Sequence, residues 1–259
     1  MPQIYDQYLG PAVFHPFAVD LARRAARLRP GRVVEIAAGT GVVTAELLAA
    51  APDARVTATD LNPAMVELGG RRVPGAVWQP ADASSLPFPD AAFDLVVCQF
   101  GVMFFPDRRA AYAEFARVLV LSGHVLFNTW DTIDTHGFAR VLVDALERAF
   151  PGDVPSFLSD VPHGYADPDV VAGDLRAAGC EVDSVETVTL EGRAASAADV
   201  AIGFCTGTPL RTEIEARGDL AVTTRSVCSE MTARLGEGPV SAPMTAHAVQ
   251  ARPREGRSP

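Results

Sequence analysis

Short apolar runs alternate with helical patterns between Arg32 and Trp130, and this alternation limits the fold more than any other feature of the sequence. The runs read as strands at residues 32–37, 55–60, 76–79, 93–98 and 124–130. Most of them are nearly continuous in apolar character, which is typical of parallel strands covered by helices on both faces. We therefore expect an α/β fold with a doubly wound, mostly parallel sheet.

The rest of the chain adds helices and two further strands. Helical patterns cover about residues 17–28, 137–149, 167–178 and much of 195–236, and strands are expected near 181–190 and 240–250. The sheet then has seven strands and is Rossmann-like. We expect a single domain over residues 1–250, with a core at about 31–130, a helical cap from about 1–30, 132–166 and 195–236, and a disordered tail at 251–259.

Charge and cysteine spacing exclude several kinds of partner. The chain of 259 residues has a net charge of -10, and its 22 basic residues are all arginine. An acidic surface repels phosphate backbones, so we expect no nucleic-acid partner. No apolar run is long enough to span a bilayer, so we expect no membrane partner and a cytoplasmic protein. The four cysteines lie far apart, which predicts no metal site, and nothing in the sequence indicates an oligomeric state.

A glycine-rich turn after the first strand is the first candidate site. It runs from Glu35 to Gly41 and leads directly into a helical pattern. Glycines in such a turn let the backbone approach a ligand closely. Asp60 ends the second strand, where a carboxylate can accept hydrogen bonds from both ribose hydroxyls. The turn and Asp60 together predict a nucleotide site, although a nicotinamide fingerprint would need a small residue where Thr44 stands.

The segment after the third strand separates the nucleotide classes. Asp82-Ala83 is followed by LPFPDAAFDLVVCQFGVMFFPD at residues 86–107. With the glycine turn and Asp60, this segment resembles the class I S-adenosylmethionine-dependent methyltransferases, in particular their small-molecule, quinone C-methyltransferase-like branch (methyltransferase type 11). The likeness covers about residues 31–130 in order and spacing.

The resemblance implies which residues hold S-adenosyl-L-methionine. They are Glu35, Ala37, Gly39, Thr40 and Gly41 for the methionine part, Asp60 for the ribose, Leu61 and Met65 for the adenine face, Asp82 for the adenine amino group, Ala83 for a backbone bond to the ring, and Gln99, Phe100 and Gly101 beside the methyl-donating centre. Tyr8 would fold over the cofactor as part of a lid or simply pack in the fold. The chain departs from the family pattern at Ala37, which replaces the first glycine, and at Leu121-Ser122-Gly123, which replace a Pro-Gly turn.

Catalysis of methyl transfer needs mainly alignment of two reactants, and a general base is needed only when the nucleophile carries a proton. The chain has five histidines, none of them at metal-ligand spacing. His136 follows the fifth strand, and His163 lies in a loop that contains proline and glycine. These two are the candidate bases, with a structural role as the alternative for each.

The sequence therefore predicts methyl transfer to a small-molecule substrate at carbon, oxygen or nitrogen. Two other functions stay open at this point. One is a nicotinamide-dependent Rossmann oxidoreductase, which Thr44 disfavours. The other is a cofactor-binding protein without turnover, because a fold does not determine a function.

Overall fold

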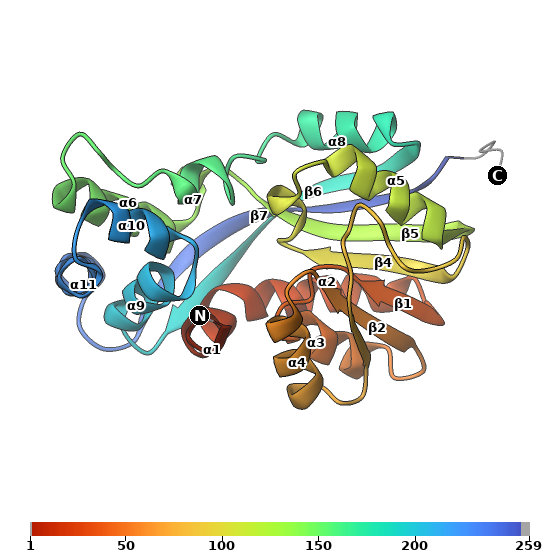
Figure 1. The fold of residues 1–259 in the computed structure, drawn as a ribbon, viewed down its shortest axis with the longest axis horizontal. Coiled ribbons are helices and arrows are strands. Elements are labelled where there is room, and N and C mark those ends of the chain that lie inside the picture. Colours follow the sequence, from red (N-terminus) through yellow and green to blue (C-terminus); the bar gives the residue numbers. More distant parts are fainter. Residues whose placement is uncertain (1, 255–259) are drawn as a thin grey trace. The chain divides into compact units, whose positions relative to one another are not determined.

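The computed structural model describes residues 2–254, which form two compact units (Figure 1). The sheet unit consists of residues 17–130, 165–188 and 246–254. The helical unit consists of residues 2–16, 131–164 and 189–245. No helix within residues 2–254 combines the length and the hydropathy that crossing a membrane requires.

The sheet has seven strands in the order β3-β2-β1-β4-β5-β7-β6. They are β1 (Arg32–Glu35), β2 (Arg55–Asp60), β3 (Val77–Pro80), β4 (Phe93–Gln99), β5 (Leu119–Trp130), β6 (Cys180–Ala194) and β7 (Val240–Pro253). The strands from β3 to β5 are parallel, and β7 is antiparallel to β5. This arrangement confirms the predicted doubly wound α/β fold. The strand order reverses between β1 and β4, which is where folds of this kind bind their ligands.

Helices cover both faces of the sheet unit. They are α2 (His15–Arg27), α3 (Val42–Ala50), α4 (Pro63–Arg72), α5 (Arg108–Val118), α8 (Pro168–Ala177) and the short 3₁₀ helix η2 (Val102–Phe104). Figure 1 shows α5 and α8 side by side above β5, with α2 and α3 on the opposite side of the strands. On the α2 and α3 side, Leu21, Leu47 and Leu126 belong to one fully buried apolar cluster. On the α5 side, Tyr112 stacks on Phe127.

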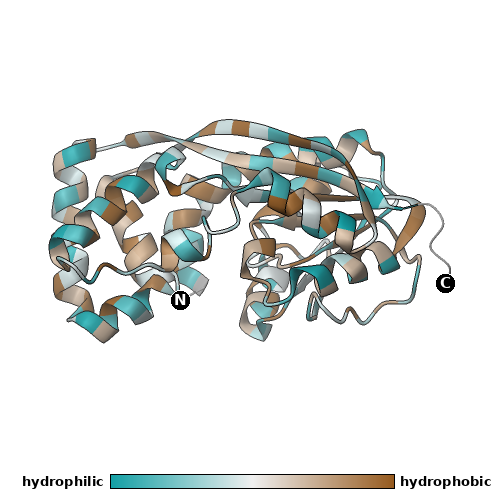
Figure 2. Ribbon diagram, turned by 90° about the horizontal axis from the view of Figure 1, so that it is seen from above, coloured by the Kyte–Doolittle hydropathy of each residue, from teal (hydrophilic) through white to brown (hydrophobic). Residues whose placement is uncertain are grey.

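The helical unit is built from short helices. They are α1 (Pro2–Ile4), the π-helix η1 (Tyr5–Phe14), the 3₁₀ helix η3 (Ile133–Thr135), α6 (Gly137–Ala149), α7 (Phe157–Asp160), α9 (Ala197–Gly207), α10 (Leu210–Arg217) and α11 (Leu220–Leu235). Figure 2 shows apolar and polar bands alternating along them, as expected for amphipathic helices. A side chain at Gly203 would lie 2.7 Å from Leu9, so this glycine lets η1 and α9 pack closely.

Several boundaries differ from the predictions. β5 begins at Leu119 rather than at 124, and a register shift against β4 absorbs Leu121-Ser122-Gly123 inside the strand. These residues therefore form a β-bulge and not a turn before the strand. The predicted tail is wrong for residues 251–253, which continue β7, and residues 255–259 lie outside the described part of the chain.

Candidate functional site

The glycine loop after β1 turns sharply through three residues with positive φ. These angles are 54° at Ala37, 56° at Gly39 and 90° at Gly41. Glycine adopts this region without strain, whereas alanine does so at a cost. Gly41 is the N-cap residue of α3. The predicted loop and its helix are therefore present, with one strained residue at Ala37.

Asp60 fixes this loop to the end of β2. The Gly39 N–H donates to Asp60 Oδ2 at 2.9 Å, and the Asn62 N–H donates to Oδ1 at 2.9 Å. Beside them, the Ala38 N–H donates to the Thr59 carbonyl at 2.8 Å. Each carboxylate oxygen of Asp60 keeps a further acceptor site. The loop and the carboxylate thus form one rigid element that can still accept hydrogen bonds.

Glu35 lies at the end of β1 and is buried, with 1% of its surface exposed. The Thr44 hydroxyl donates to Glu35 Oε2 at 2.6 Å. Burial raises the pKa of Glu35 to about 8, and the nearby Asp60 carboxylate adds to the rise. In the sequence, Thr44 served only to disfavour a nicotinamide site. Its role as the hydrogen-bond donor to Glu35 was not predicted.

The predicted adenine residues follow β2 and β3. Leu61 exposes 71% of its surface, and Met65 is half-buried in the first turn of α4. Asp82 is exposed, and its Oδ1 accepts hydrogen bonds from the Ser84 N–H and hydroxyl, which lower its pKa. Ala83 is buried. Because the carboxyl ends of parallel strands meet at one edge, these residues and the glycine loop share that edge of the sheet.

The turn after β4 meets the glycine loop directly. A Cβ on Gly101 would lie 2.6 Å from the Ala37 Cβ and 2.7 Å from the Cys98 sulfur. Phe100 has a φ of 52°, and its ring stacks on Trp130 with centroids 3.7 Å apart and planes 6° apart. The Phe17 ring meets both edge to face. The structure thus brings the β4 residues and the glycine loop together, next to an aromatic cluster.

Trp78 packs against the glycine loop, a role that the sequence analysis did not predict. Its indole N–H donates to the Val73 carbonyl at 3.0 Å. A Cβ on Gly69 would lie 2.3 Å from the indole ring, and one on Gly41 would lie 3.1 Å from it. The small residues of α4 and of the loop therefore make room for this ring. The Gly69-Gly70 pair inside a helical pattern could have indicated this packing, because a glycine in a helix interior often makes room for a neighbouring side chain.

His136, His163 and Tyr8 belong to the helical unit. His136 is 1% exposed and caps α6, since its Nδ1 accepts the Ala139 N–H at 3.2 Å. Burial and the neighbouring His163 lower the pKa of His136 to about 3. The His163 ring lies 5.5 Å from the His136 ring, and its Nδ1 is 2.6 Å from the Asp131 carbonyl. Tyr8 is half-buried in η1, next to Gly203 of α9.

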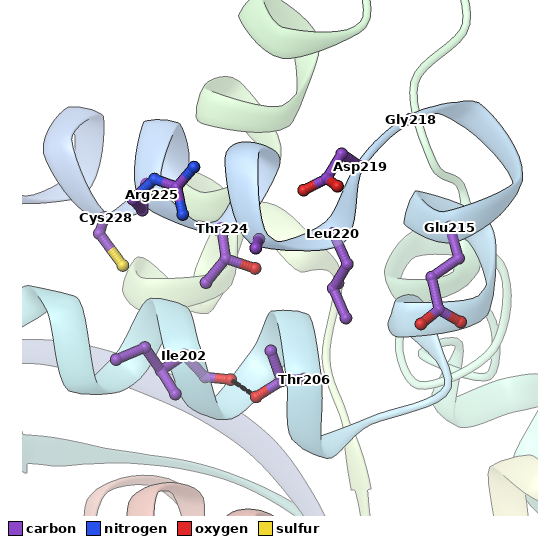
Figure 3. Close-up of a pocket in the computed structure, with 10 residues that line it drawn as sticks. Ile202, Thr206, Glu215, Gly218, Asp219, Leu220, Thr224, Arg225 and Cys228 are labelled. Atoms are coloured by element: carbon purple, nitrogen blue, oxygen red, sulfur yellow. Dashed lines mark hydrogen bonds between the residues drawn. The ribbon is translucent and has the colours of Figure 1, made fainter.

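The helical unit also contains an open hollow of about 960 Å³ between α9, α10 and α11 (Figure 3). It is lined by Ile202, Thr206, Glu215, Gly218, Asp219, Leu220, Ala221, Thr224, Arg225 and Cys228. Its carboxylates already have structural partners, because Glu215 pairs with Arg211 and Asp219 caps α11 at the Val222 N–H. None of the predicted site residues lines this hollow.

Known proteins share the fold and parts of the sequence. The profile of a family described as a methyltransferase domain matches residues 34–127. A demethylmenaquinone methyltransferase of Corynebacterium urealyticum is 35% identical over 170 residues, 61% of this chain and 72% of that one. The ubiquinone/menaquinone biosynthesis C-methyltransferase UbiE of Methylobacterium nodulans is 31% identical over 177 residues, 62% and 70% of the two chains. An N-methyltransferase of Haemonchus contortus, solved with phosphomonomethylethanolamine and S-adenosylhomocysteine, has the same fold, with a TM-score of 0.62 at 13% identity over 98% of this chain and 57% of that one.

The burial of Glu35 predicts a pH-dependent stability. In the folded chain the pKa of Glu35 is about 8, so the group keeps its proton up to about that pH, whereas an unfolded glutamate loses its proton near its ordinary pKa of 4.5. The contribution of Glu35 to the unfolding free energy therefore falls as pH rises between these values, by up to about 1.4 kcal/mol per pH unit. Glu35→Gln carries no such proton and should remove this slope. Urea unfolding from pH 5 to 9 measures it, with the exposed Glu147→Gln as the matched control. Identical slopes in the parent and Glu35→Gln would contradict the assignment.

The contact between Gly101 and Ala37 predicts an energetic coupling. Gly101→Ala places a methyl group against Ala37 and Cys98 and should lower the unfolding free energy by about 1–3 kcal/mol. Ala37→Gly removes one of the two clashing atoms and the strained φ, so the double variant should recover part of the loss. Chemical denaturation of the parent, both single variants and the double variant gives the coupling energy. Strictly additive effects would show that the two turns do not touch.

Proposed function

The chain belongs to the class I S-adenosylmethionine-dependent methyltransferases, in the quinone C-methyltransferase branch, and from this membership we propose a cofactor site, a substrate class and a base for its reaction. The sequence prediction of a methyltransferase acting on a small molecule is confirmed. The relatives favour neither of the two alternative functions, a nicotinamide-dependent oxidoreductase and a cofactor-binding protein without turnover. When bound, the cofactor supplies an activated methyl group on a positively charged sulfur.

The residues of the sheet unit fit this cofactor. Gly39 has open space beyond its Cα, so a ligand can lie against its backbone. The exposed Leu61 offers an apolar surface for a flat base. The observation that carries the proposal is the carboxylate of Asp60, which anchors the Gly39 N–H and keeps acceptor sites for two ribose hydroxyls. Leu61 and Met65 then contact the adenine, Asp82 and Ala83 bind its edge, and the Glu35–Gly41 loop with Gln99, Phe100 and Gly101 holds the methionine part.

For the substrate, we propose a reduced, oxygen-bearing aromatic ring that is methylated at carbon. The relatives from Corynebacterium urealyticum and Methylobacterium nodulans are named for quinone biosynthesis. The buried cluster of Phe17, Phe100 and Trp130 makes the surroundings of the turn after β4 apolar and aromatic, which suits a flat apolar ring bound beside it. A net charge of -10 disfavours substrates with several phosphates. A dihydroxynaphthalene with an unsubstituted ring carbon is therefore the first compound to test.

Of the two predicted bases, we propose His163. Its Nδ1 donates to the Asp131 carbonyl, and a ring of this tautomer carries its basic lone pair on Nε2. Burial lowers the pKa of His163, so the ring is neutral at pH 7 and able to accept the proton of a phenolic hydroxyl. His136 uses its Nδ1 lone pair to cap α6, which supports a structural role.

Asp60 is tested by calorimetric titration with S-adenosylhomocysteine. Asp60→Ala should weaken binding by about 1.5–3 kcal/mol, the range for hydrogen bonds to a charged group. Asp60→Asn keeps an acceptor oxygen for Gly39 and should lose less. The exposed Asp53→Ala is the matched control and should bind like the parent. Unchanged affinity in Asp60→Ala would refute the ribose assignment.

His163 is tested by rate against pH with 1,4-dihydroxynaphthalene, under anaerobic conditions. His163→Gln should lower kcat by about 100-fold at pH 7, because general bases contribute at least that much. The rate of the parent enzyme should fall as the pH drops through the pKa of His163, which lies below its ordinary value of 6.5. His163→Gln should show no such fall in rate. His136→Asn keeps a capping side chain and should lower stability while leaving the shape of the profile intact. A rate–pH profile of His163→Gln identical to that of the parent would show that His163 takes no proton. Alignment of the two reactants would then be the whole mechanism.

A further inference from the structure

Asn128 carries a buried amide group without a hydrogen-bond partner. Its side chain is 0% exposed in β5. Neither its Oδ1 nor its Nδ2 has a partner among the residues that the structure describes. A primary amide has two donors and an acceptor with two lone pairs, and burying it unpaired costs stability. A buried polar group of this kind calls for an explanation.

The fold itself does not use this amide. The backbone of Asn128 is fixed by the strand ladder and by its carbonyl, which accepts the Phe100 N–H at 3.2 Å. Side chains alternate along a strand, so Asn128 shares a sheet face with Leu126 and Trp130. Both of these are apolar and buried. A leucine would therefore satisfy the packing at this position, and the sequence has a polar group where the fold favours an apolar one.

The position of Asn128 links it to the proposed site. It is the register partner of Gln99 on the parallel strand β4, so the two side chains leave the sheet on the same face. The turn after β4 holds the backbone of Phe100 in the left-handed region, with the Phe100 ring stacked on Trp130. Strained backbone of this kind concentrates at functional sites. The amide thus lies at the carboxyl edge of the sheet, beside the residues assigned to the methyl-donating centre.

We propose that Asn128 binds an oxygen substituent of the methyl-accepting ring and selects substrates that carry one. This inference rests on the proposed function and extends it to a residue that the sequence did not indicate. Nδ2 donates to a phenolate oxygen, or Oδ1 accepts from a hydroxyl. A ring without oxygen leaves the amide unpaired, which is how sites built for hydrogen bonding reject apolar analogues. Because the amide is covered, entry of the substrate requires a neighbouring side chain to move.

The test compares Asn128→Leu with a matched control on the same strand. Thr129 is also 0% exposed, and its hydroxyl has no partner among the described residues, but it faces the opposite side of the sheet. Thr129→Val therefore removes an unpaired buried polar group outside the proposed site. The measurements are thermal stability, S-adenosylhomocysteine affinity, and kcat/KM for 1,4-dihydroxynaphthalene.

Both variants should be at least as stable as the parent, with affinity for S-adenosylhomocysteine within about twofold, and only Asn128→Leu should lose kcat/KM, by about 100-fold or more. Parent-like kcat/KM in Asn128→Leu would overturn the inference and leave the proposed function standing. A marked loss of stability in Asn128→Leu would overturn it too, because the amide would then serve the fold. Absence of turnover by the parent chain would overturn the proposed substrate class and this inference together.

Discussion

The hydrogen bond from the Gly39 N–H to Asp60 is the interaction on which the account of the site depends. It joins the loop after β1 to the end of β2, at 2.9 Å across the carboxyl edge of the sheet. The neighbouring bond from Ala38 to the Thr59 carbonyl ties the same two segments. A carboxylate that both anchors the glycine loop and keeps acceptor sites fixes the distance between the parts of a ligand that it binds. In the proposed site, one rigid element therefore positions both the ribose and the methionine part of the cofactor.

Features that cost stability gather at this edge of the sheet. Ala37 and Phe100 have positive φ, Glu35 is buried with a raised pKa, and Asn128 has an unpaired amide. Each breaks a local rule; among the described residues elsewhere in the sheet unit, Arg29 and Ala91 also have positive φ, and Thr129 also has an unpaired buried hydroxyl. Proteins that fold well tend to break such rules where they bind or react. The concentration of these costs is thus a physical argument for the position of the site, independent of any sequence motif.

Sequence patterns predicted the elements that depend on local order. The run from β1 through the glycine loop into α3, the acid at the end of β2 and the helix at residues 137–149 all follow from periodicity and capping residues. The start of β5 was missed because the bulge at Leu121-Ser122-Gly123 depends on pairing with β4. Thr44, Trp78 and Asn128 were missed for a related reason. Their roles come from partners far away in the chain, or from the lack of one, which no local pattern records.

The most direct measurement is a crystal structure of the chain with S-adenosylhomocysteine. Both ribose hydroxyls are expected within hydrogen-bond distance of the Asp60 carboxylate, with the bond to Gly39 retained. The sulfur is expected next to the turn of Gln99, Phe100 and Gly101. A ligand bound elsewhere, or an Asp60 carboxylate that makes no contact with the ribose, would contradict the account.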